Sequence, residues 1–371
     1  MASDGNSFRK LILVYSFWFL SLMLSASLFE VYFFNLGMPL QDIYLVNCFW
    51  FLISLIAIPF LKGLRTRDFM LIGIAFAICA ASVLILFPVV ESAYAFRLLI
   101  SGIYLFFWIP FNILYYEHRK GNNATIGALY FSVAPLISLV APAAAGFIAT
   151  SLGFPALFSL AIASFMLTAI LVYLFVENKT YSYDIRASIK AMSGLKSLIF
   201  IEGFAMTVLL WTTLPITLLT FIDRPLGYGL MMSLLTIFTV IAAIFTGRMS
   251  DRFKRRREFI LPTVLLLALS AIFASQATDL ALFFVGFAMI NFFSGVFFPL
   301  PFALLLDNTS SLVDMMIGRE MILNIGRICG TIFGLMVFIL TDIQTVILMQ
   351  AIIILLYIPV FENRKKKLKI Y

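Results

Sequence analysis

Apolar runs of about 20 residues recur along the whole chain, and they constrain its fold more than any other feature. A transmembrane helix needs about 20 consecutive apolar residues, whereas the strands of a membrane barrel alternate polar and apolar positions. Of the 371 residues, 63% are hydrophobic and 12% are charged, against about 25% charged in a soluble domain. So few charges cannot cover a water-soluble surface, which excludes a cytosolic enzyme, a secreted disulfide scaffold and a disordered protein. We predict an all-α polytopic membrane protein.

Cutting the apolar runs at charged residues, proline and glycine gives about twelve transmembrane helices. They are predicted at residues 9–35, 43–61, 69–88, 94–116, 125–150, 155–176, 197–222, 228–247, 259–277, 280–306, 318–340 and 343–361. Most connections are very short, but the stretch from Glu177 to Lys196 is polar and amphipathic. We therefore predict a first six-helix half at 1–176, a cytoplasmic linker at 177–196, and a second half at 197–371 that ends in a basic tail.

Basic residues gather on one side of this topology. With the N-terminus placed inside, 22 of the 26 Lys and Arg residues fall in inside segments, and only Arg224 falls in an outside loop. Because Lys and Arg accumulate in cytoplasmic loops, we predict that both termini are cytoplasmic and that the chain lies in the cell (inner) membrane. The net charge of +8 then reflects topology and contact with anionic lipid, and not nucleic-acid binding.

Little in the sequence points to catalysis or to a metal. Cys48, Cys79 and Cys329 all lie within apolar runs, with no metal-ligand spacing and no disulfide framework, and His118 is the single histidine. The sequence has no cluster of nucleophile and base at one interface, and no P-loop of the form G-x-x-x-x-G-K-S/T. We expect no enzyme activity, no cofactor, no metal and no self-contained ATP-driven pump.

The two halves repeat each other weakly. With a shift of 191 residues, Pro-Phe at 110–111 falls on Pro-Phe at 301–302, and with a shift of 190 residues, Arg-Asp-Phe at 67–69 falls on Arg-Glu-Phe at 257–259. The matches keep their register across corresponding loops, so we predict two pseudo-symmetric halves in parallel orientation. Paired halves with a site near the middle of the bilayer are a plan of secondary transporters.

The loop after the eighth predicted helix carries the most specific motif. It reads G-R-M-S-D-R-F-K-R-R-R from Gly247 to Arg257 and resembles the signature loop of the major facilitator superfamily, G-x-x-x-D-R/K-x-G-R-R/K. The matching residues are Gly247, Asp251, Arg252, Arg255 and Arg256, while Lys254 stands at the family's second glycine. The resemblance implies a cytoplasmic gate in which Asp251 lies at the N-terminal end of the fifth helix, near residues 125–127, where the helix dipole favours negative charge. A plain positive-inside loop would require neither Gly247 nor Asp251.

The resemblance also implies a secondary active transporter that works by alternating access. The element A-P-A-A-A-G at 141–146 resembles the G-P-x-x-G-G element of family exporters, although a small-residue helix interface explains it equally well. We therefore predict a monomeric antiporter that exports a small amphiphilic compound in exchange for protons. The alternatives are proton- or solute-coupled uptake of a small organic solute, and a membrane enzyme or scaffold that transports nothing.

Two charged residues inside predicted helices of the first half are candidates for proton coupling. Glu30 lies near the outer end of the first helix, and Arg97 lies at a similar depth in the fourth, where it resembles the family's fourth-helix arginine. Charges within the membrane are costly and face protein or water, so we expect these two to pair. The pair couples proton movement to transport, or it is a static ion pair, or Glu30 reaches the interface.

The predicted substrate cavity takes residues from several helices. On the eleventh helix, Glu320, Asn324 and Arg327 follow i, i+4, i+7 spacing and share one face. This stripe is either a substrate or gating site or a lock between helices. Polar and aromatic residues on other helices complete the predicted cavity, although aromatic residues in membrane helices more often pack or face lipid. They are Trp18, Ser25, Trp108, Asn112, Trp211 and Asn291.

Overall fold

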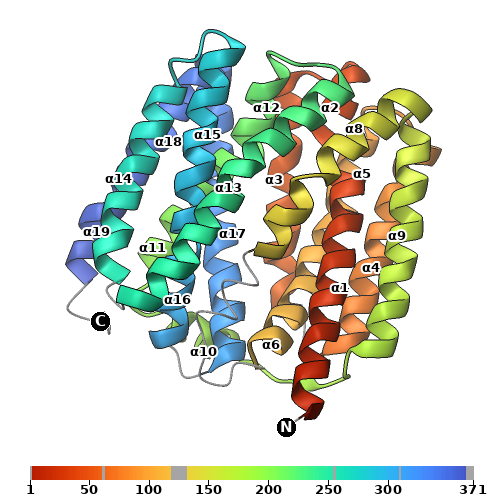
Figure 1. The fold of residues 1–371 in the computed structure, drawn as a ribbon, viewed down its shortest axis with the longest axis vertical. Helices are drawn as coiled ribbons and strands as arrows, with labels where there is room; N and C mark the ends of the chain where they lie inside the picture. Colours follow the sequence, from red (N-terminus) through yellow and green to blue (C-terminus); the bar gives the residue numbers. More distant parts are fainter. Residues whose placement is uncertain (1, 61–62, 118–131, 254–255, 309–310, 365–371) are drawn as a thin grey trace.

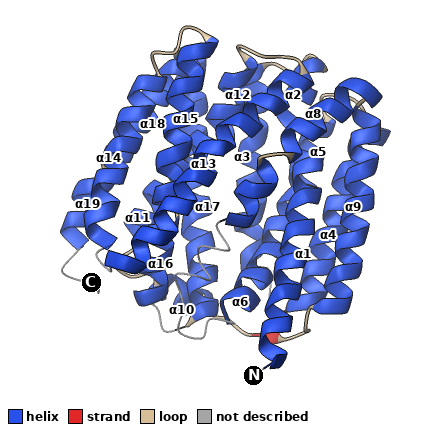
Figure 2. Cartoon of the chain, in the orientation of Figure 1, coloured by secondary structure: helices blue, strands red, loops and turns tan. Residues whose placement is uncertain are grey.

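The chain folds almost entirely into helices (Figures 1 and 2). The computed structural model describes residues 2–60, 63–117, 132–253, 256–308 and 311–364. Within these ranges, eleven helices are long and apolar enough to cross a membrane, and a shorter apolar helix, Glu258–Ala274, occupies the ninth position along the chain. The prediction of an all-α protein with about twelve membrane helices is confirmed.

The first half has six segments, and several of them are built from two or three shorter helices. They are α1 (Ala2–Ala26) with α2 (Phe29–Asn35), α3 (Leu40–Ala57) with η1 (Ile58–Phe60), α4 (Thr66–Leu86), α5 (Ser92–Ile103) with η2 (Tyr104–Trp108) and α6 (Ile109–Glu117), residues 132–138 with α8 (Ala141–Leu152), and α9 (Phe154–Phe175). Gly37 and Gly153 turn the chain between helices with φ of +92° and +85°, a left-handed conformation that glycine adopts without a steric penalty.

The second half has the same plan. Its helices are α11 (Lys196–Ile201) with η3 (Glu202–Thr207), η4 (Leu209–Thr213) and α12 (Leu214–Leu219), α13 (Pro225–Phe253), α14 (Arg256–Ala274), α15 (Leu280–Phe297) with α16 (Pro299–Asn308), α17 (Leu312–Leu340), and α18 (Ile343–Leu355) with α19 (Tyr357–Arg364). Side-chain caps fix several starts: Asp279 accepts hydrogen bonds at the start of α15, and Asp342 accepts one at the start of α18.

The polar stretch between the halves contacts both of them. It contains β2 (Thr180–Tyr181), which pairs antiparallel with β1 (Leu64–Arg65), and α10 (Ile185–Ala191). On the first half, the hydroxyl of Tyr183 donates to the carbonyl of Ile58 at 2.6 Å. On the second half, the hydroxyl of Ser188 donates to Asp314 at 2.9 Å. The stretch therefore lies across the end of the molecule that carries both termini (Figure 1).

The observed helices differ from the predicted ones mainly at their ends. Helix α17 begins at Leu312 instead of residue 318, because Ser311 caps it and Asp314 occupies its first turn. Helix α13 continues to Phe253, beyond the predicted end at 247, so part of the predicted loop motif is helical. The predicted start of the fifth helix at 125 lies outside the described residues.

Helices of the two halves meet in two related places. Helix α3 packs against α17, and α8 packs against α13. In each case the second segment of one half meets the fifth segment of the other half. This exchange of partners is what a pseudo-twofold relation between two six-helix halves produces, as the weak repeat in the sequence predicts.

Small residues bring α8 and α13 close together. A Cβ atom added at Gly146 would overlap the carbonyl oxygen of Pro225, and one added at Gly229 would overlap that of Pro142. The hydroxyl of Ser233 also accepts a hydrogen bond from the amide of Ala143 at 3.1 Å. The element at 141–146 therefore forms a close helix–helix interface between the halves.

We expect Gly229→Val to destabilise this interface. The new side chain meets the backbone of α8, which cannot rotate away, and overpacking costs about 1–3 kcal/mol or more. Thermal unfolding of the purified protein in detergent should show a lower Tm than wild type. Thr150→Val is the matched control because Thr150 is exposed on α8, and its Tm should not change. An unchanged Tm in Gly229→Val would mean that the two helices are not packed this closely.

Candidate functional site

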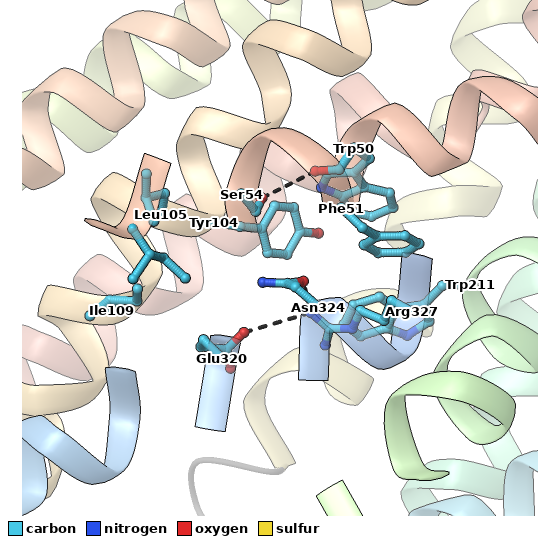
Figure 3. Close-up of a pocket in the computed structure, with 11 residues that line it drawn as sticks. Trp50, Phe51, Ser54, Tyr104, Leu105, Ile109, Trp211, Glu320, Asn324 and Arg327 are labelled. Atoms are coloured by element: carbon cyan, nitrogen blue, oxygen red, sulfur yellow. Dashed lines mark hydrogen bonds and ion pairs between the residues drawn. The ribbon is translucent and has the colours of Figure 1, made fainter. Parts of the chain in front are cut away.

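A small pocket lies between the two halves (Figure 3). Its walls come from η1, η2, α3 and α6 of the first half and from η4 and α17 of the second. The lining residues are Trp50, Phe51, Ser54, Ile58, Tyr104, Leu105, Ile109, Trp211, Glu320, Asn324 and Arg327. The free space holds about one water molecule. The side chains therefore nearly fill the pocket in this conformation.

Helix irregularities surround the pocket. Tyr104 and Leu105 lie in η2, Trp211 lies in η4, and Glu202 lies in η3, and all three segments are π-helical. The π-helix is rare, and its single turns are found frequently at functional sites. Four of the residues in or beside the pocket thus come from the segments where the fourth and seventh membrane helices depart from regular α geometry.

A network of two carboxylates and two guanidinium groups joins the seventh and eleventh membrane helices. Arg319 donates to Glu202 at 2.7 Å and to Glu320 at 3.0 Å. The Nη1 atom of Arg327 lies 3.6 Å from the other oxygen of Glu320. Opposite charges are balanced in this group, which reduces the cost of placing them among apolar helices. The predicted stripe on α17 thus belongs to a network between helices of the second half.

Arg327 is the cationic side chain of the pocket lining. It donates to the amide oxygen of Asn324 at 2.9 Å, and its guanidinium lies 4.8 Å from the ring centre of Trp211 and 5.6 Å from that of Phe51. Guanidinium groups stack favourably on aromatic rings. Arg327 therefore contacts both halves of the protein, through Trp211 in its own half and Phe51 in the other.

The predicted pair of Glu30 and Arg97 is present in the structure. The Nη2 atom of Arg97 donates to the Oε1 atom of Glu30 at 2.9 Å, with only 2% and 7% of the two side chains exposed. Glu30 lies in α2, at the end of the molecule opposite the termini (Figure 1), and Arg97 lies in α5. The guanidinium also covers Phe29 at 3.7 Å and Trp50 at 4.7 Å.

Aromatic rings connect this pair to the pocket. Trp50 packs on Tyr104 with 4.8 Å between ring centres and stacks on Trp211 at 6.0 Å. Because Arg97 lies over Trp50 and Arg327 lies over Trp211, the rings bridge the two arginines. The buried charges of the first half and those of the second are thus joined by direct contacts through the pocket wall.

Trp18 and Trp108, both predicted cavity residues, lie outside the pocket lining. Trp18 is buried and stacks on Phe107 with 4.5 Å between ring centres. Trp108 packs on Trp18 at 5.0 Å and on Tyr15 at 5.8 Å. These rings form a packed contact between the first and fourth membrane helices, which is the more common role of aromatic residues in such helices.

The polar residues Ser25, Asn112 and Asn291 also lie outside the pocket lining. The Ser25 hydroxyl donates to the carbonyl of Leu22 at 3.0 Å, and Asn112 is buried in α6. Asn291 donates to its own helix and accepts a hydrogen bond from Thr239 of α13 at 3.2 Å. Asn291 therefore holds two helices of the second half together. Of the nine predicted cavity residues, Trp211, Glu320, Asn324 and Arg327 line the pocket.

The predicted gate motif lies where α13 ends and α14 begins. Gly247, Asp251 and Arg252 belong to the last turns of α13, and Arg256 opens α14. Arg255 lies outside the described residues, as do the side chains of this stretch and residues 125–127, where Asp251 is expected to bind. The gate contact therefore stays a prediction.

Glu202 is the charged residue of the site that sequence reasoning missed. It is a single carboxylate within the seventh apolar run, and the rule that singled out Glu30 would have found it. Trp50 and Tyr104 gave no comparable signal, because 16% of the chain is aromatic and such residues occur in nearly every run. Which of them line the pocket depends on how the two halves dock.

Comparison with known proteins identifies the fold. The family model of the Major Facilitator Superfamily matches residues 197–369, and no curated protein sequence matches the chain. The structure is similar to that of the human organic anion transporter MFSD10, with a TM-score of 0.66, 15% identity, and coverage of 96% of this chain and 98% of that one.

Two further solved structures show the same fold. The E. coli fucose:proton symporter FucP has a TM-score of 0.69 and 12% identity, covering 96% of this chain and 98% of its own. A POT family transporter in complex with 5-aminolevulinic acid has a TM-score of 0.72 and 12% identity, and the match covers 98% of this chain and 97% of that one. The family model matches the second half in sequence, and the fold over the whole chain is similar to that of major facilitator superfamily transporters, in agreement with the loop motif.

We expect Arg319→Gln to destabilise the second half strongly. It leaves Glu202 without its hydrogen-bonded partner, and breaking a buried ion pair on one side costs about 3–5 kcal/mol. Thermal unfolding of the purified protein should show a large loss of Tm, and the double variant Glu202→Gln/Arg319→Gln should recover part of it. Arg65→Gln is the control: its pair with Asp68 is 3.8 Å long and 65% exposed at Arg65, which predicts a loss below about 1 kcal/mol. Equal losses in the two arginine variants would show that the network is not buried.

Proposed function

We propose that this chain is a proton-coupled secondary transporter that moves a small amphiphilic compound by alternating access. The observation that carries the proposal is the buried pair of Glu30 and Arg97, whose arginine stacks on the pocket residue Trp50. A carboxylate at this depth is a candidate for carrying a proton. Arg97 pairs with Glu30 and lies over Trp50, so a proton on Glu30 can influence the pocket wall through the arginine.

The coupling follows from the charges of the pair. A proton on Glu30 removes its negative charge and weakens its attraction for Arg97. Since Arg97 rests on Trp50, and Trp50 contacts Trp211 of the other half, a shift of the arginine changes the contact between the halves. A ligand or proton shifts a conformational equilibrium by its difference in affinity for the two states. Protonation therefore favours one orientation of the halves, and release of the proton favours the other.

We propose export by proton antiport as the direction, with coupled uptake of a small organic solute as the alternative. Seven of the eleven lining side chains are apolar or aromatic. An amphiphilic compound crosses a bilayer down its concentration gradient without a carrier. A carrier with such a lining is therefore useful chiefly for moving the compound against that gradient. The resemblance of the element at 141–146 to the family's exporter element also favours export. The fucose:proton symporter among the similar folds is the observation that favours the alternative.

The proposed orientation places both termini in the cytoplasm and the chain, as a monomer, in the cell membrane. Both termini lie at the same end of the bundle (Figure 1). Lys10, Arg67 and Lys179 belong to this end, where Lys10 covers the ring of Phe175 and Arg67 covers that of Tyr173. Basic residues at a cytoplasmic surface follow the positive-inside rule and attract anionic lipid.

We expect Glu30→Gln to abolish transport driven by a pH gradient and to preserve exchange of substrate for substrate. The amide keeps the shape and hydrogen bonding of the side chain but cannot release a proton. The measurement uses proteoliposomes and a panel of radiolabelled solutes and dyes, with and without a pH gradient, to find what the wild type moves. The variant is then compared on those solutes in both assays.

Glu91→Gln is the matched control for this experiment, because Glu91 is an exposed acidic residue just before α5. It should keep both activities. Gradient-driven transport at the wild-type rate in Glu30→Gln would eliminate Glu30 as the coupling group. If Glu30→Gln loses exchange as well, Glu30 shapes the substrate site in addition to any role in carrying the proton.

For the gate motif, we expect Asp251→Asn to slow transport about tenfold or more, which is at least about 1.4 kcal/mol on the barrier. Removing the negative charge weakens its proposed attraction for the N-terminal end of the fifth helix. Insertion into the membrane and substrate binding should be nearly unchanged. Asp68→Asn, at a half-exposed aspartate in the first turn of α4 in the first half, is the control and should keep the wild-type rate. A full rate in Asp251→Asn would contradict the gate.

A further inference from the structure

We propose that the pocket takes an organic anion, whose carboxylate or similar group binds Arg327 and whose flat apolar body lies against Trp50, Tyr104 and Trp211. This inference rests on the proposed transport function and names its substrate class. Three observations carry it: the unused donors of Arg327, the engagement of the neighbouring carboxylates elsewhere, and the aromatic walls of both halves (Figure 3).

Arg327 has donors to spare. An arginine presents five N–H groups in a fixed fork that matches a carboxylate. Arg327 is only 7% exposed, donates to Asn324 at 2.9 Å, and has a buried Nε that forms no hydrogen bond with any described residue. Buried polar groups are normally hydrogen-bonded. In Figure 3 the side chains of Asn324 and Arg327 project from α17 toward the aromatic rings of the pocket.

The nearby carboxylates do not satisfy Arg327. Both Glu202 and Glu320 form short hydrogen bonds with Arg319, at 2.7 and 3.0 Å. The nearest oxygen of Glu320 is 3.6 Å from Arg327, which is too long for a charge-assisted hydrogen bond. Glu320 also lines the pocket, but its short hydrogen bond goes to Arg319, so Arg327 is the charged lining residue without a short bond to an opposite charge. Arg97, the other deeply buried arginine, is held directly by Glu30 at 2.9 Å, so Arg327 is the cation that an incoming anion would meet.

The walls beside Arg327 suit a flat apolar body. Trp50 and Tyr104 of the first half and Trp211 of the second have ring centres 4.8 to 6.4 Å apart. Aromatic side chains bind other rings by offset and edge-to-face contacts at such spacings. Because Arg327 lies over Trp211 at 4.8 Å, an anionic group and an attached apolar group reach their partners together.

Entry requires the halves to separate. The pocket has room for about one water molecule, and contacts between the halves lie at either end of it. On the side of the termini, Tyr116 of α6 packs on Phe302 of α16 at 5.0 Å, and at the opposite end α2 contacts α12. An anion that enters when one end opens would displace the long contact of Glu320 with Arg327 and leave the bonds of Arg319 in place.

The test is the binding of three small aromatic probes to the purified protein: benzoate, benzylamine and benzyl alcohol. Trp50 and Trp211 are two of the four tryptophans and line the pocket, so binding changes the tryptophan fluorescence. Benzoate should bind saturably and about tenfold more tightly, or better, than either other probe. Equal binding of the three probes, or tighter binding of benzylamine, would overturn the anion site.

Variants locate the site. Arg327→Gln should weaken benzoate binding about tenfold or more and leave benzyl alcohol unchanged. Arg327→Lys keeps the charge without the fork and should be intermediate, so it replaces Arg327→Gln if that variant does not fold. Arg65→Gln, at an exposed arginine, is the control. If Arg327→Gln folds and binds benzoate with wild-type affinity, Arg327 has no role in the site. If only Arg327→Lys folds, wild-type affinity in that variant refutes the role of Arg327.

This outcome is separable from that of the coupling proposal. Binding is measured without a pH gradient and with Glu30 intact, so benzoate can bind at Arg327 even if Glu30→Gln keeps gradient-driven transport. In that case the coupling proposal fails and the anion site stands. If the proteoliposomes show gradient-driven transport of a cationic or neutral solute and benzoate does not bind, the transport function stands and the anion site fails.

Discussion

The cost of placing charge among apolar helices governs the organisation of this protein. The bilayer offers no water to solvate a guanidinium or a carboxylate, so each one buried in the bundle needs an opposite charge or other strong partners. Glu30 and Arg97 meet this requirement by pairing in the first half, and Glu202 with Arg319 does so in the second. Such charges are expensive to keep, which is why their position beside a pocket between the halves is informative about function.

The contact between the halves combines two kinds of interface. Helices α8 and α13 approach through Gly146 and Gly229, where backbones nearly touch. At the centre, in contrast, the halves meet through large rings, with Trp50 of one stacked on Trp211 of the other. The close contact involves backbone atoms of both helices, whereas the ring contact involves side chains alone.

Much of the fold and part of the site could be predicted from the sequence. Length and spacing of the apolar runs gave twelve segments, because the bilayer sets the length of a helix that crosses it. The pairing of Glu30 with Arg97 could be anticipated because two opposite charges at one depth each need a partner. Asn291 shows the opposite case: its polarity made it a cavity candidate, yet it holds α15 to α13. Polarity alone does not tell whether a side chain faces a ligand or a neighbouring helix.

The sequence by itself determined the membrane class, the number of helices, the repeat of the halves and the residues that had to find a charge partner. These features depend on local composition and on the energetics of burial, which act on every segment separately. Only the tertiary structure decided that Trp50, Tyr104 and Trp211 form one wall, that Glu202 joins Arg319, and that Arg327 is left with unused donors beside the pocket. Those outcomes depend on the rotation and docking of helices far apart in the chain, and on the π-helical turns that shift side chains around them. No local pattern in the sequence encodes that docking.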